Sequence, residues 1–500
     1  MSGHLIGLDL GTSFVKASLY DFEGHELVVE REPLSIIYPA PGWVEQNPLE
    51  WWLAIQKVLR LIDQQIDPKT VQAVGLCAQC PGHVLLGRDN KPIGNAIIWC
   101  DKRAVNEAGW LKEQITPEES STWVGSNQLG DPYCSPARLL WLKNHHGSFN
   151  QVEYFLQPKD YIGFMLTGKM ATDIHTSFLL AHPVTSKYHP TFLEILGLQA
   201  DQLPPVLAPT DLLGGISELA AELTGLSEST PVFVGTIDAY CDTLAGGAFI
   251  PGQAVDVSGT SEIVSLGVKN RVEGQGVFSV NLGNNVNFLC GPMQAGGSVL
   301  NWLANSLYPE INQKNAFAIL ESEACQVDAG TDGLIFLPYL QGERAPIWDS
   351  QVRGAFLGIN ESHTRHNFSR AVYEGVGFAI HHVLEICENV SGCKADRMII
   401  CGGGARSQFW NTIKANILQK TIYPLRVVNS GCLGAAMISA VGMNVYSNFS
   451  DAWKRMSNLG EPILPDPCLA NLYDESYGIY RRAYPGLQIV FANPSGKGSL

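Results

Sequence analysis

The sequence predicts an α/β protein built from two similar domains. Segments rich in β-branched and aromatic residues alternate with helix-like segments along the chain. A hairpin with a Gly-Thr-Ser turn occurs at residues 6–21 and again at 256–267, roughly half a chain apart. The chain has 500 residues, of which 45% are apolar and 16% charged, so it can form more than one domain core.

The composition also limits the partners. A net charge of −15 argues against non-specific nucleic-acid binding, which needs a basic surface. No signal peptide is visible, because residues 1–20 already indicate a strand hairpin. The long uncharged stretch 427–450 contains polar residues and glycines, so it predicts a buried helix and not a membrane span. Twelve irregularly spaced cysteines indicate reduced thiols. We therefore expect a cytoplasmic protein without membrane partners.

The first hairpin carries a candidate phosphate site. Its turn, Gly11-Thr12-Ser13, offers backbone N–H groups and two hydroxyls. Asp9 lies at the edge of this turn and can hold Mg²⁺ through water, since Mg²⁺ keeps much of its hydration. An ordinary polar hairpin is the commoner explanation of one such turn. The second turn, Gly259-Thr260-Ser261, makes the pair more specific and predicts two domains that clamp one polyphosphate.

Between the hairpins, the sequence predicts a helix ending near residue 63, a strand at 71–76 and a helix from 158 to 168. After the strand come Cys77, Cys80 and His83, whose spacing could suit a metal, although zinc normally takes four ligands. Two alternatives are a pocket loop in which Gln79 and His83 bind hydroxyls, and a buried thiol pair with a satisfied histidine.

Residues 97–103 predict a strand that leads into a charged turn, in which Asp101 follows the aromatic Trp99. In a sugar site, an aspartate accepts bonds from two hydroxyls and a tryptophan covers the apolar face of the sugar. The alternative is a surface turn in which Asp101 forms a salt bridge with Arg103.

The stretch 235–247 is where we expect the chemistry. A buried strand is predicted at 231–234 and a helix at 239–245, so Asp238 lies where the strand ends and the helix begins. Backbone N–H groups and the positive end of the helix dipole keep a carboxylate there ionised and oriented. Such a group can accept a proton from a substrate hydroxyl. The alternative is a simple helix N-cap.

In the second half, Gly296-Gly297 enters a helix, and residues 369–389 form a long apolar-periodic helix. Residues 398–407 indicate a strand, a glycine turn and a helix, which is a layout suited to close approach of a planar or anionic ligand. The predicted domains are 1–248 and 249–485, with the boundary near residues 249–252. The polar tail, 486–500, is expected to be mobile.

Together these segments resemble the FGGY carbohydrate kinases of the actin-like ATPase superfamily, and within that family the xylulokinase branch. The resemblance runs from residue 6 to about 442. It is carried by Gly7-Leu-Asp-Leu-Gly-Thr-Ser13, Pro158-Lys-Asp-Tyr161, Gly259-Thr-Ser261, Phe336-Leu-Pro-Tyr-Leu-Gln-Gly-Glu-Arg-Ala-Pro346, Glu374-Gly-Val-Gly377 and Gly402-Gly-Gly-Ala-Arg-Ser407. It implies two RNase-H-like domains, of the actin/hexokinase/Hsp70 type, with a nucleotide and sugar cleft between them.

The resemblance also implies an activity, namely transfer of the γ-phosphoryl group of ATP to a primary hydroxyl of a ketopentose such as D-xylulose. Asp238 would be the general base and Asp9 would support Mg²⁺. The sugar site would comprise Gln79, Cys80, Pro81, His83, Trp99 and Asp101. The ATP site would comprise Thr12, Ser13, Lys16, Gly259, Thr260, Gly297, Asn301, Gly403, Gly404, Ala405 and Gln408.

Two positions depart from the xylulokinase pattern. The usual Met-His-Gly is replaced by Cys80-Pro81-Gly82, and the usual Gly-Gly-Gly-Asp-Asn by Gly235-Thr-Ile-Asp-Ala239. Both touch the sugar in that family, so kinases for ribulose, gluconate, glycerol or another polyol stay as alternatives. A nucleotide-driven binding protein is a second class. A nicotinamide-dependent dehydrogenase is a third, but no GxGxxG follows the first strand. A homodimer is compatible with the sequence, which does not determine the oligomeric state.

Overall fold

A computed structural model describes residues 3–125, 129–309 and 316–491. The chain divides into two compact units. The first comprises Met1–Asp242 and Val427–Met456, and the second comprises Thr243–Arg426 and Ser457–Leu500. The predicted boundary after residue 248 therefore differs from the observed division in two respects. The first segment ends six residues earlier, and residues 427–456 return to the first unit.

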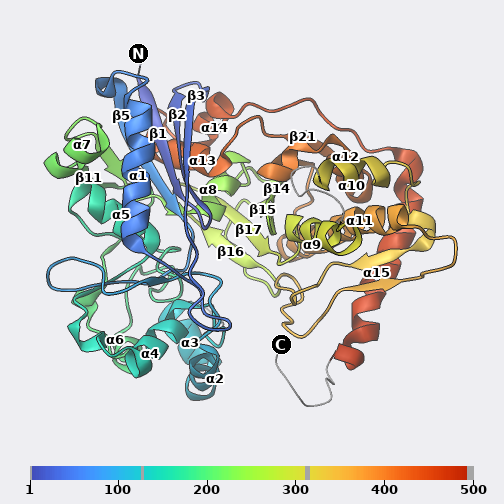
Figure 1. Ribbon diagram of the computed structural model, residues 1–500, viewed down its shortest axis with the longest axis horizontal. Coiled ribbons are helices and arrows are strands. Elements are labelled where there is room, and N and C mark those ends of the chain that lie inside the picture. The colour runs from blue at the N-terminus through green and yellow to red at the C-terminus, as the bar shows by residue number, and fades with distance from the viewer. Residues whose placement is uncertain (1–2, 126–128, 310–315, 492–500) are drawn as a thin grey trace. The chain divides into compact units, whose positions relative to one another are not determined.

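The sheet of the first unit has the strand order β11-β12-β5-β1-β2-β3, and β13 also pairs with β5 (Figure 1). Strand β1 runs antiparallel to β2, as the predicted hairpin requires, and parallel to β5. The strands are β1 (His4–Leu10), β2 (Phe14–Asp21), β3 (Glu26–Pro33), β5 (Val71–Ala78), β11 (Leu212–Gly215), β12 (Pro231–Phe233) and β13 (Thr236–Ile237).

Helices α1 (Pro48–Asp63) and α13 (Ser430–Gly442) cover opposite faces of this sheet. A Cβ atom on Gly7 of β1 would lie 1.8 Å from the carbonyl oxygen of Cys432, so only glycine permits the close approach of α13. Because side chains alternate along a strand, Ile6 and Leu8 point to the other face, where they join the apolar cluster of α1. Asp9 shares the α13 face with Gly7.

The first unit also contains a helical region with its own apolar core, formed around helices α2, α3, α4 and α6. Two short strand pairs, β4 with β7 and β6 with β8, support the loops of this region. The elements are β4 (Glu45–Gln46), β6 (Val84–Leu86), β7 (Ala96–Ile97), α2 (Val105–Gln114), α3 (Pro117–Val124), α4 (Ser135–His145), β8 (Tyr154–Leu156), α5 (Pro158–Thr167), β9 (Thr172–Asp173), α6 (Pro190–Leu196), β10 (Val206–Leu207), α7 (Glu218–Thr224), α8 (Asp238–Ala245) and α14 (Phe449–Met456).

The sheet of the second unit has the order β16-β17-β15-β14-β20-β21. Its strands β14, β15 and β17 run antiparallel, whereas β20 and β21 run parallel to β14, which repeats the pattern of β1, β2, β3, β5 and β12. The strands are β14 (Gln253–Ser258), β15 (Glu262–Gly267), β16 (Phe278–Asn281), β17 (Asn287–Pro292), β20 (Arg397–Cys401) and β21 (Thr421–Pro424). The prediction of two similar α/β domains is therefore confirmed.

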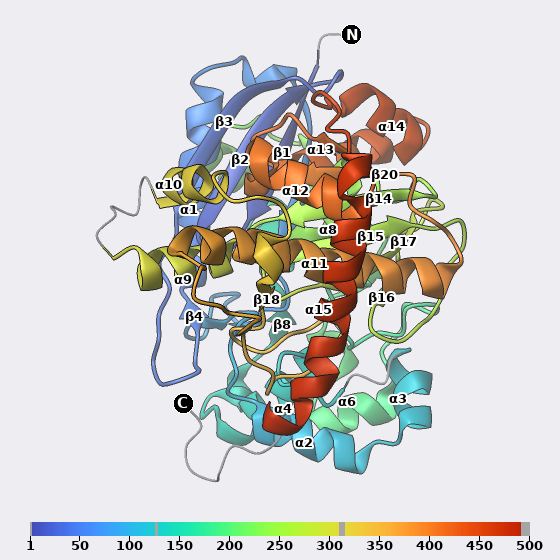
Figure 2. The same cartoon turned by 90° about the vertical axis from the view of Figure 1, so that its right-hand side faces the viewer.

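The long helix α11 packs with α9, α10, α12 and α15 around the main apolar cluster of this unit (Figure 2). Helix α11 contains the predicted helix at 369–389 and extends beyond it at both ends. The elements are α9 (Gly297–Leu307), α10 (Ala316–Ala324), β18 (Ile335–Leu337), β19 (Ala355–Leu357), α11 (Arg365–Ser391), α12 (Gln408–Leu418) and α15 (Ala470–Phe491).

Two predictions concern segments near the chain's end. Within the tail expected to be mobile, residues 486–491 are the last turns of α15, and residues 492–500 lie outside the described residues. The uncharged stretch 427–450 contains α13, whose residues 430–441 are all buried. Within the described parts of the chain, no helix combines the length and apolarity needed to cross a membrane.

Candidate active site

Asp238 is the first residue of helix α8, directly after strand β13. Strand β13 pairs with the carboxyl end of β5, where Ile237 lies opposite Ala78. The Oδ1 atom of Asp238 accepts a 2.7 Å hydrogen bond from the Ala239 N–H. The predicted strand at 231–234 is present as β12, and the predicted helix at 239–245 is present as α8, which begins one residue earlier. The short strand β13 between them was not predicted, and it leads directly into the half-buried carboxylate of Asp238.

The electrostatic surroundings of Asp238 bring its titration close to neutral pH. Burial, together with the carboxylates of Asp9 and Asp242, raises the pKa of Asp238 from 3.8 to about 7. Burial likewise raises the pKa of Asp242 to about 6. Lys16 opposes these shifts. A carboxylate that titrates near neutral pH is suited to exchange a proton with a substrate hydroxyl.

Asp9 and Lys16 face each other across the first hairpin, where the register pairs them directly. Lys16 Nζ donates a 2.8 Å bond to Asp9 Oδ2. The other oxygen, Asp9 Oδ1, is buried and has no partner among the residues the structure describes. A buried carboxylate oxygen without a donor fits a hydrated Mg²⁺, which prefers oxygen ligands.

The surroundings of Asp9 do not form a metal site in which several side chains coordinate the ion directly. In the described ranges, no group of three or more His, Cys, Asp or Glu residues is arranged to hold a metal ion. Mg²⁺ is commonly held in enzymes by one or two carboxylates, with water and substrate phosphate as further ligands. Asp9 and its surroundings fit that mode.

The start of helix α13 lies against the two carboxylates. A Cβ atom on Gly431 would lie 3.4 Å from Asp9 Oδ2 and 3.5 Å from Asp242 Oδ1, so both carboxylates approach the backbone there. Sequence reasoning missed Asp242 and Ser430. Asp242 could have been found, because it lies four residues after Asp238 and so on the same helix face. Ser430 carries no such sequence signal.

The turn at Gly11, Thr12 and Ser13 has free backbone donors. Gly11 N–H bonds Phe14 O at 3.0 Å, but the N–H groups of Thr12 and Ser13 have no partner in the described portion of the chain. The Thr12 hydroxyl is engaged, because it accepts a 2.8 Å bond from Trp99 Nε1 and donates at 3.2 Å to Gln79 Oε1. The turn therefore presents two unpartnered backbone N–H groups, whereas the Thr12 hydroxyl is already bonded to Trp99 and Gln79.

The loop at Cys80 and Pro81 is held from below by Arg138 on α4. Arg138 is fully buried and donates to the carbonyl oxygens of Pro81 (3.2 Å), Trp99 (2.6 Å) and Asp101 (3.0 Å). It thus joins the two loops that were predicted to form the sugar site, a role that sequence reasoning missed. The Cys80 thiol is half-buried and points to Thr176 O at 3.6 Å.

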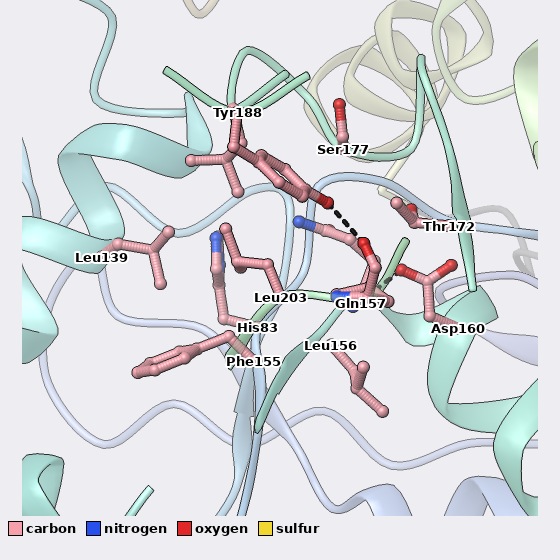
Figure 3. Close-up of a pocket in the computed structure, with 12 residues that line it drawn as sticks. His83, Leu139, Phe155, Leu156, Gln157, Asp160, Thr172, Ser177, Tyr188 and Leu203 are labelled. Atoms are coloured by element: carbon pink, nitrogen blue, oxygen red, sulfur yellow. Dashed lines mark hydrogen bonds between the residues drawn. The ribbon is translucent and has the colours of Figure 1, made fainter. Parts of the chain in front are cut away.

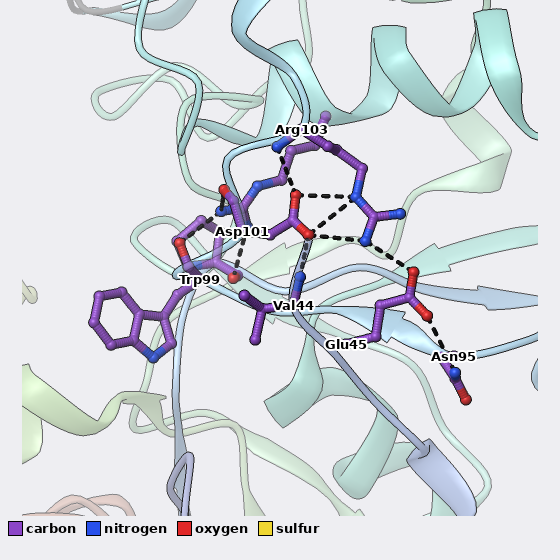
Figure 4. A network of polar contacts seen from close by, with 8 residues as sticks. Val44, Glu45, Asn95, Trp99, Asp101 and Arg103 are labelled. Carbon is purple, nitrogen blue, oxygen red and sulfur yellow. Dashed lines mark hydrogen bonds and ion pairs between the residues drawn. The ribbon is translucent and has the colours of Figure 1, made fainter. Parts of the chain in front are cut away.

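Asp101 is enclosed in a polar network and presents no open oxygen (Figure 4). Its Oδ2 atom accepts bonds from Val44 N–H (2.6 Å) and from the Arg103 guanidinium (2.8 Å). Arg103 also pairs with Glu45 at 2.8 Å. The salt bridge considered as the alternative exists, but it is buried and not at the surface. A sugar could bind Asp101 only by displacing Arg103.

His83 is buried inside the first unit and lines the cavity drawn in Figure 3. This cavity has a volume of about 20 Å³ and a second cavity about 80 Å³, and His83 lines both. The smaller has room for one water and not for a sugar. Neither ring nitrogen of His83 has a protein partner among the described residues. Burial lowers the pKa of His83 well below its usual range, so the ring is neutral.

The cysteines of the same motif point to different partners. Cys77 Sγ lies 3.5 Å from Gly431 O, whereas Cys80 points to Thr176. All twelve cysteines of the chain are free thiols.

In the second unit, the Gly259–Ser261 turn meets the start of α9. Gly297 N–H donates to Gly259 O and Ser298 N–H to Thr260 O, both at 2.9 Å. The N–H groups of Thr260 and Ser261 have no partner within the described ranges. The predicted nucleotide residues Gly259, Thr260 and Gly297 are therefore together.

The Gly402–Gly404 turn packs on the same strand end. A Cβ atom on Gly404 would lie only 2.0 Å from Ser258 Oγ, whereas one on Gly403 would meet nothing within 4 Å. Gly403 is exposed and Ala405 packs at the edge of the apolar core. The side chains of Asn301 and Gln408, also predicted to bind nucleotide, lie exposed on α9 and at the start of α12.

A buried ionic cluster lies beneath this turn. Lys414 Nζ donates to Asp256 Oδ2 at 2.6 Å and lies 3.7 Å from Glu262 Oε2, and all three side chains are fully buried. Ser258 Oγ bonds Glu262 Oε1 at 2.8 Å. Burial opposes the charge on Lys414, but the two carboxylates raise its pKa overall. The cluster fixes both strands that carry the Gly259 turn.

Comparison with known proteins gives matches over most of the chain. The model of the FGGY family of carbohydrate kinases, N-terminal domain, matches residues 4–245, and the C-terminal domain model matches residues 254–443. The chain is 27% identical over 492 residues to a xylulose kinase of Bacillus subtilis (strain 168), covering 96% of each chain. It is 31% identical over 513 residues to the L-xylulose/3-keto-L-gulonate kinase of Escherichia coli (strain K12), covering 98% of each.

The fold is similar to that of solved sugar kinases. The structure of a gluconate kinase from Lactobacillus acidophilus has a TM-score of 0.89 and 26% identity, covering 98% of this chain and 99% of that one.

Proposed function

Because the chain belongs to the FGGY family of carbohydrate kinases, it is a sugar phosphotransferase, and we propose that it transfers the γ-phosphoryl group of ATP to a primary hydroxyl of a ketopentose, with D-xylulose as the first candidate. The observation that carries this proposal is the position of Asp238. Its carboxylate is half-buried at a strand end, bonded to Ala239 N–H, with a pKa raised to about 7.

In the proposed reaction, different residues of the first unit accept the proton, bind phosphate and contact the sugar. Asp238 accepts the proton of the attacking hydroxyl as the oxygen–phosphorus bond forms. The free N–H groups of Thr12 and Ser13 bind phosphate oxygens, and Lys16 adds positive charge beside them. Trp99 covers an apolar face of the sugar, and Cys80 and Pro81 form the adjoining wall. Because phosphoryl transfer has a loose transition state, positioning and charge neutralisation supply most of the catalysis.

Mg²⁺ would be held by Asp9, directly or through water, and would neutralise charge on the phosphate oxygens when bound. In the second unit, Gly259, Thr260 and Gly297 provide a further phosphate-binding turn. Gly403, Gly404 and Ala405, with Asn301 and Gln408, complete the proposed adenosine site. The other two residues predicted for the sugar site, Gln79 and His83, are buried, and Gln79 acts through the bond that it accepts from the Thr12 hydroxyl.

An aldonate or a different ketose is the second candidate. The loop at Cys80 and Pro81 departs from the xylulokinase pattern, and relatives with similar identity are named for L-xylulose, 3-keto-L-gulonate and gluconate. A substrate panel resolves the choice. ADP release would be measured with D-xylulose, L-xylulose, D-ribulose, gluconate and glycerol, and the sugar with the highest kcat/KM identifies the class. If none of them stimulates ADP release above the rate without sugar, the proposal is wrong.

We further propose a cytoplasmic location, on the basis of the composition and the free cysteines, and a homodimer, with which the sequence is compatible. Size-exclusion chromatography with light scattering tests the second, since it distinguishes a particle of one chain from a particle of two.

A further inference from the structure

A buried glutamine, Gln46, bonds the phosphate turn and Gln79 but has no direct part in the proposed reaction. Gln46, on β4, is fully buried. Its Nε2 group donates to Thr12 O at 2.8 Å and to Ser35 O at 3.1 Å. Its Oε1 atom accepts from Gln79 Nε2 at 2.7 Å and from Trp51 Nε1 at 3.2 Å. All hydrogen-bonding positions of this amide are therefore filled.

This filling allows only one orientation of the amide. If the Gln46 amide were reversed, its NH₂ group would face the NH₂ group of Gln79 and the indole N–H of Trp51, and three donors would oppose one another. The Thr12 hydroxyl is fixed in the same way, because it accepts from Trp99 and donates to Gln79. The chain of bonds from Trp99 to the phosphate turn therefore has a single arrangement and acts as a stiff connection.

We propose that Gln46 is a positioning residue that couples the sugar loop to the phosphate turn. This rests on the proposed kinase function. A sugar that packs against Trp99 holds the indole in place, the indole holds the Thr12 hydroxyl, and Gln46 holds the Thr12 carbonyl. The N–H groups of Thr12 and Ser13 are then aimed at phosphate before the nucleotide binds.

The coupling must work in both directions. If bound sugar raises the affinity for nucleotide, bound nucleotide raises the affinity for sugar by the same factor. For coupled sites this factor is commonly between about 5- and 150-fold. Loss of the connection reduces the factor toward one, whereas loss of a direct contact lowers the affinity of one ligand whether or not the other is present.

The experiment is a binding cycle by titration calorimetry. The affinity for the sugar substrate identified by the panel is measured with and without a non-hydrolysable ATP analogue and Mg²⁺. In Gln46→Met, which is similar in length but has no amide, the ratio of the two affinities should fall to within about two-fold of one. Sugar affinity without nucleotide should stay within a few-fold of wild type. Gln46→Glu keeps the acceptor but not the donor, and should give the same fall.

Two further variants separate coupling from general damage. Thr12→Val should abolish the coupling and Thr12→Ser should restore it, because serine keeps the hydroxyl that links Trp99 to Gln79. Gln253→Met in the second unit is the matched control. Gln253 is equally buried and donates to Gly246 O at 2.7 Å and Gly247 O at 3.2 Å, so its loss should lower stability but keep the coupling.

Coupling retained in Gln46→Met and Gln46→Glu, with the fold intact, overturns the inference and leaves the kinase function in place. Independent binding of sugar and nucleotide in the wild type overturns it as well. If Gln46→Met does not fold, Thr12→Val against Thr12→Ser still decides, since equal coupling in those two contradicts the connection. Absence of any sugar-dependent ADP release is a separate result, which removes the proposed function itself.

Discussion

Ser430 Oγ donates a 2.5 Å hydrogen bond to Oδ1 of Asp242, although the two residues are 188 positions apart. Through this bond the late helix α13 influences a carboxylate beside Asp238 and Asp9. The bond lowers the pKa of Asp242, against burial, which raises it to about 6.

Replacing Ser430 by alanine should therefore raise the pKa of Asp242. A hydrogen bond to a charged group contributes about 1.5–3 kcal/mol, which corresponds to about one to two pKa units. Carboxyl carbon NMR over a pH titration measures this shift. Ser447→Ala is the control, because Ser447 makes a 2.6 Å bond to an aspartate at the surface, Asp451, and should leave Asp242 unchanged. An Asp242 titration equal to that of wild type would contradict the assignment.

Asp238→Asn should remove activity and change how stability depends on pH. The pKa of Asp238 is raised from 3.8 to about 7, so the folded protein binds more protons than the unfolded chain between these values. The free energy of unfolding of the wild type therefore falls as pH rises through this window. Asp238→Asn has no group that titrates at this position, so its free energy of unfolding lacks this decrease. The gain in Tm of Asp238→Asn over wild type should grow from pH 4 to pH 7 and then level off.

For the same variant, kcat should fall by about 10²–10⁴-fold, the usual effect of losing a positioned base. Thermal unfolding at several pH values and an ADP-release assay give the two readouts. Asp201→Asn, at an exposed site, should change neither. Activity within a few-fold of wild type would refute the role of Asp238 as the base.

Lys16 should set the pH at which the enzyme gains activity. Its positive charge lowers the pKa of Asp238, so Lys16→Met should raise that pKa further. Because the base must be ionised, the acid limb of kcat/KM should move to higher pH in the variant. The pH profile of kcat/KM is the measurement, with Lys187→Met at the surface as control. An acid limb that stays in place would show that Lys16 does not act on the base.

Gly404 and Gly403 form a matched pair for the second unit. Gly404→Ala should destabilise this unit, since the new Cβ would lie 2.0 Å from Ser258 Oγ. Gly403→Ala meets no atom within 4 Å and should leave thermal stability unchanged. If the adenosine packs there, Gly403→Ala should still weaken ADP binding, measured by calorimetry. Equal unfolding temperatures for the two variants would contradict the packing described.

Arg103→Met should unfold the protein more readily without a direct loss of substrate contact. The side chains of Arg103 and Asp101 are 3% and 0% exposed, and their ion pair measures 2.8 Å. Removing one partner of a buried pair costs about 3–5 kcal/mol, because the other charge stays buried and unpaired. Denaturant unfolding measures the cost. The double variant with Asp101→Asn should lose less than the sum of the single changes.

Local patterns were sufficient for the elements that carry the site. The two Gly-Thr-Ser hairpins, strand β12 and helix α8 were predictable, because each depends on residues within a few positions, whereas the two-residue strand β13 was not predicted. Arg138, Gln46 and Ser430 were not, because they act through backbone carbonyls or side chains far away in the sequence. Their residue types carry no signal until the loops they join are seen together.

The same limit explains the roles assigned to Asp101 and His83. Aspartate and histidine both suit sugar binding. Only the structure shows that Asp101 is neutralised by Arg103 and that His83 faces two small cavities. The sequence could not indicate which side of its loop His83 would occupy, since that depends on helix α4, whose Leu139 and Leu142 line the cavities beside it.

The return of residues 427–456 to the first unit has a consequence for biosynthesis. A ribosome that has made the first 242 residues has produced all of the sheet but not α13, so the flat surface at Gly7 and Gly75 is still bare. The first unit therefore stays incomplete until residues 427–456 have been translated. A fragment cut at the apparent end of the first segment would therefore be expressed as an incomplete, aggregation-prone product.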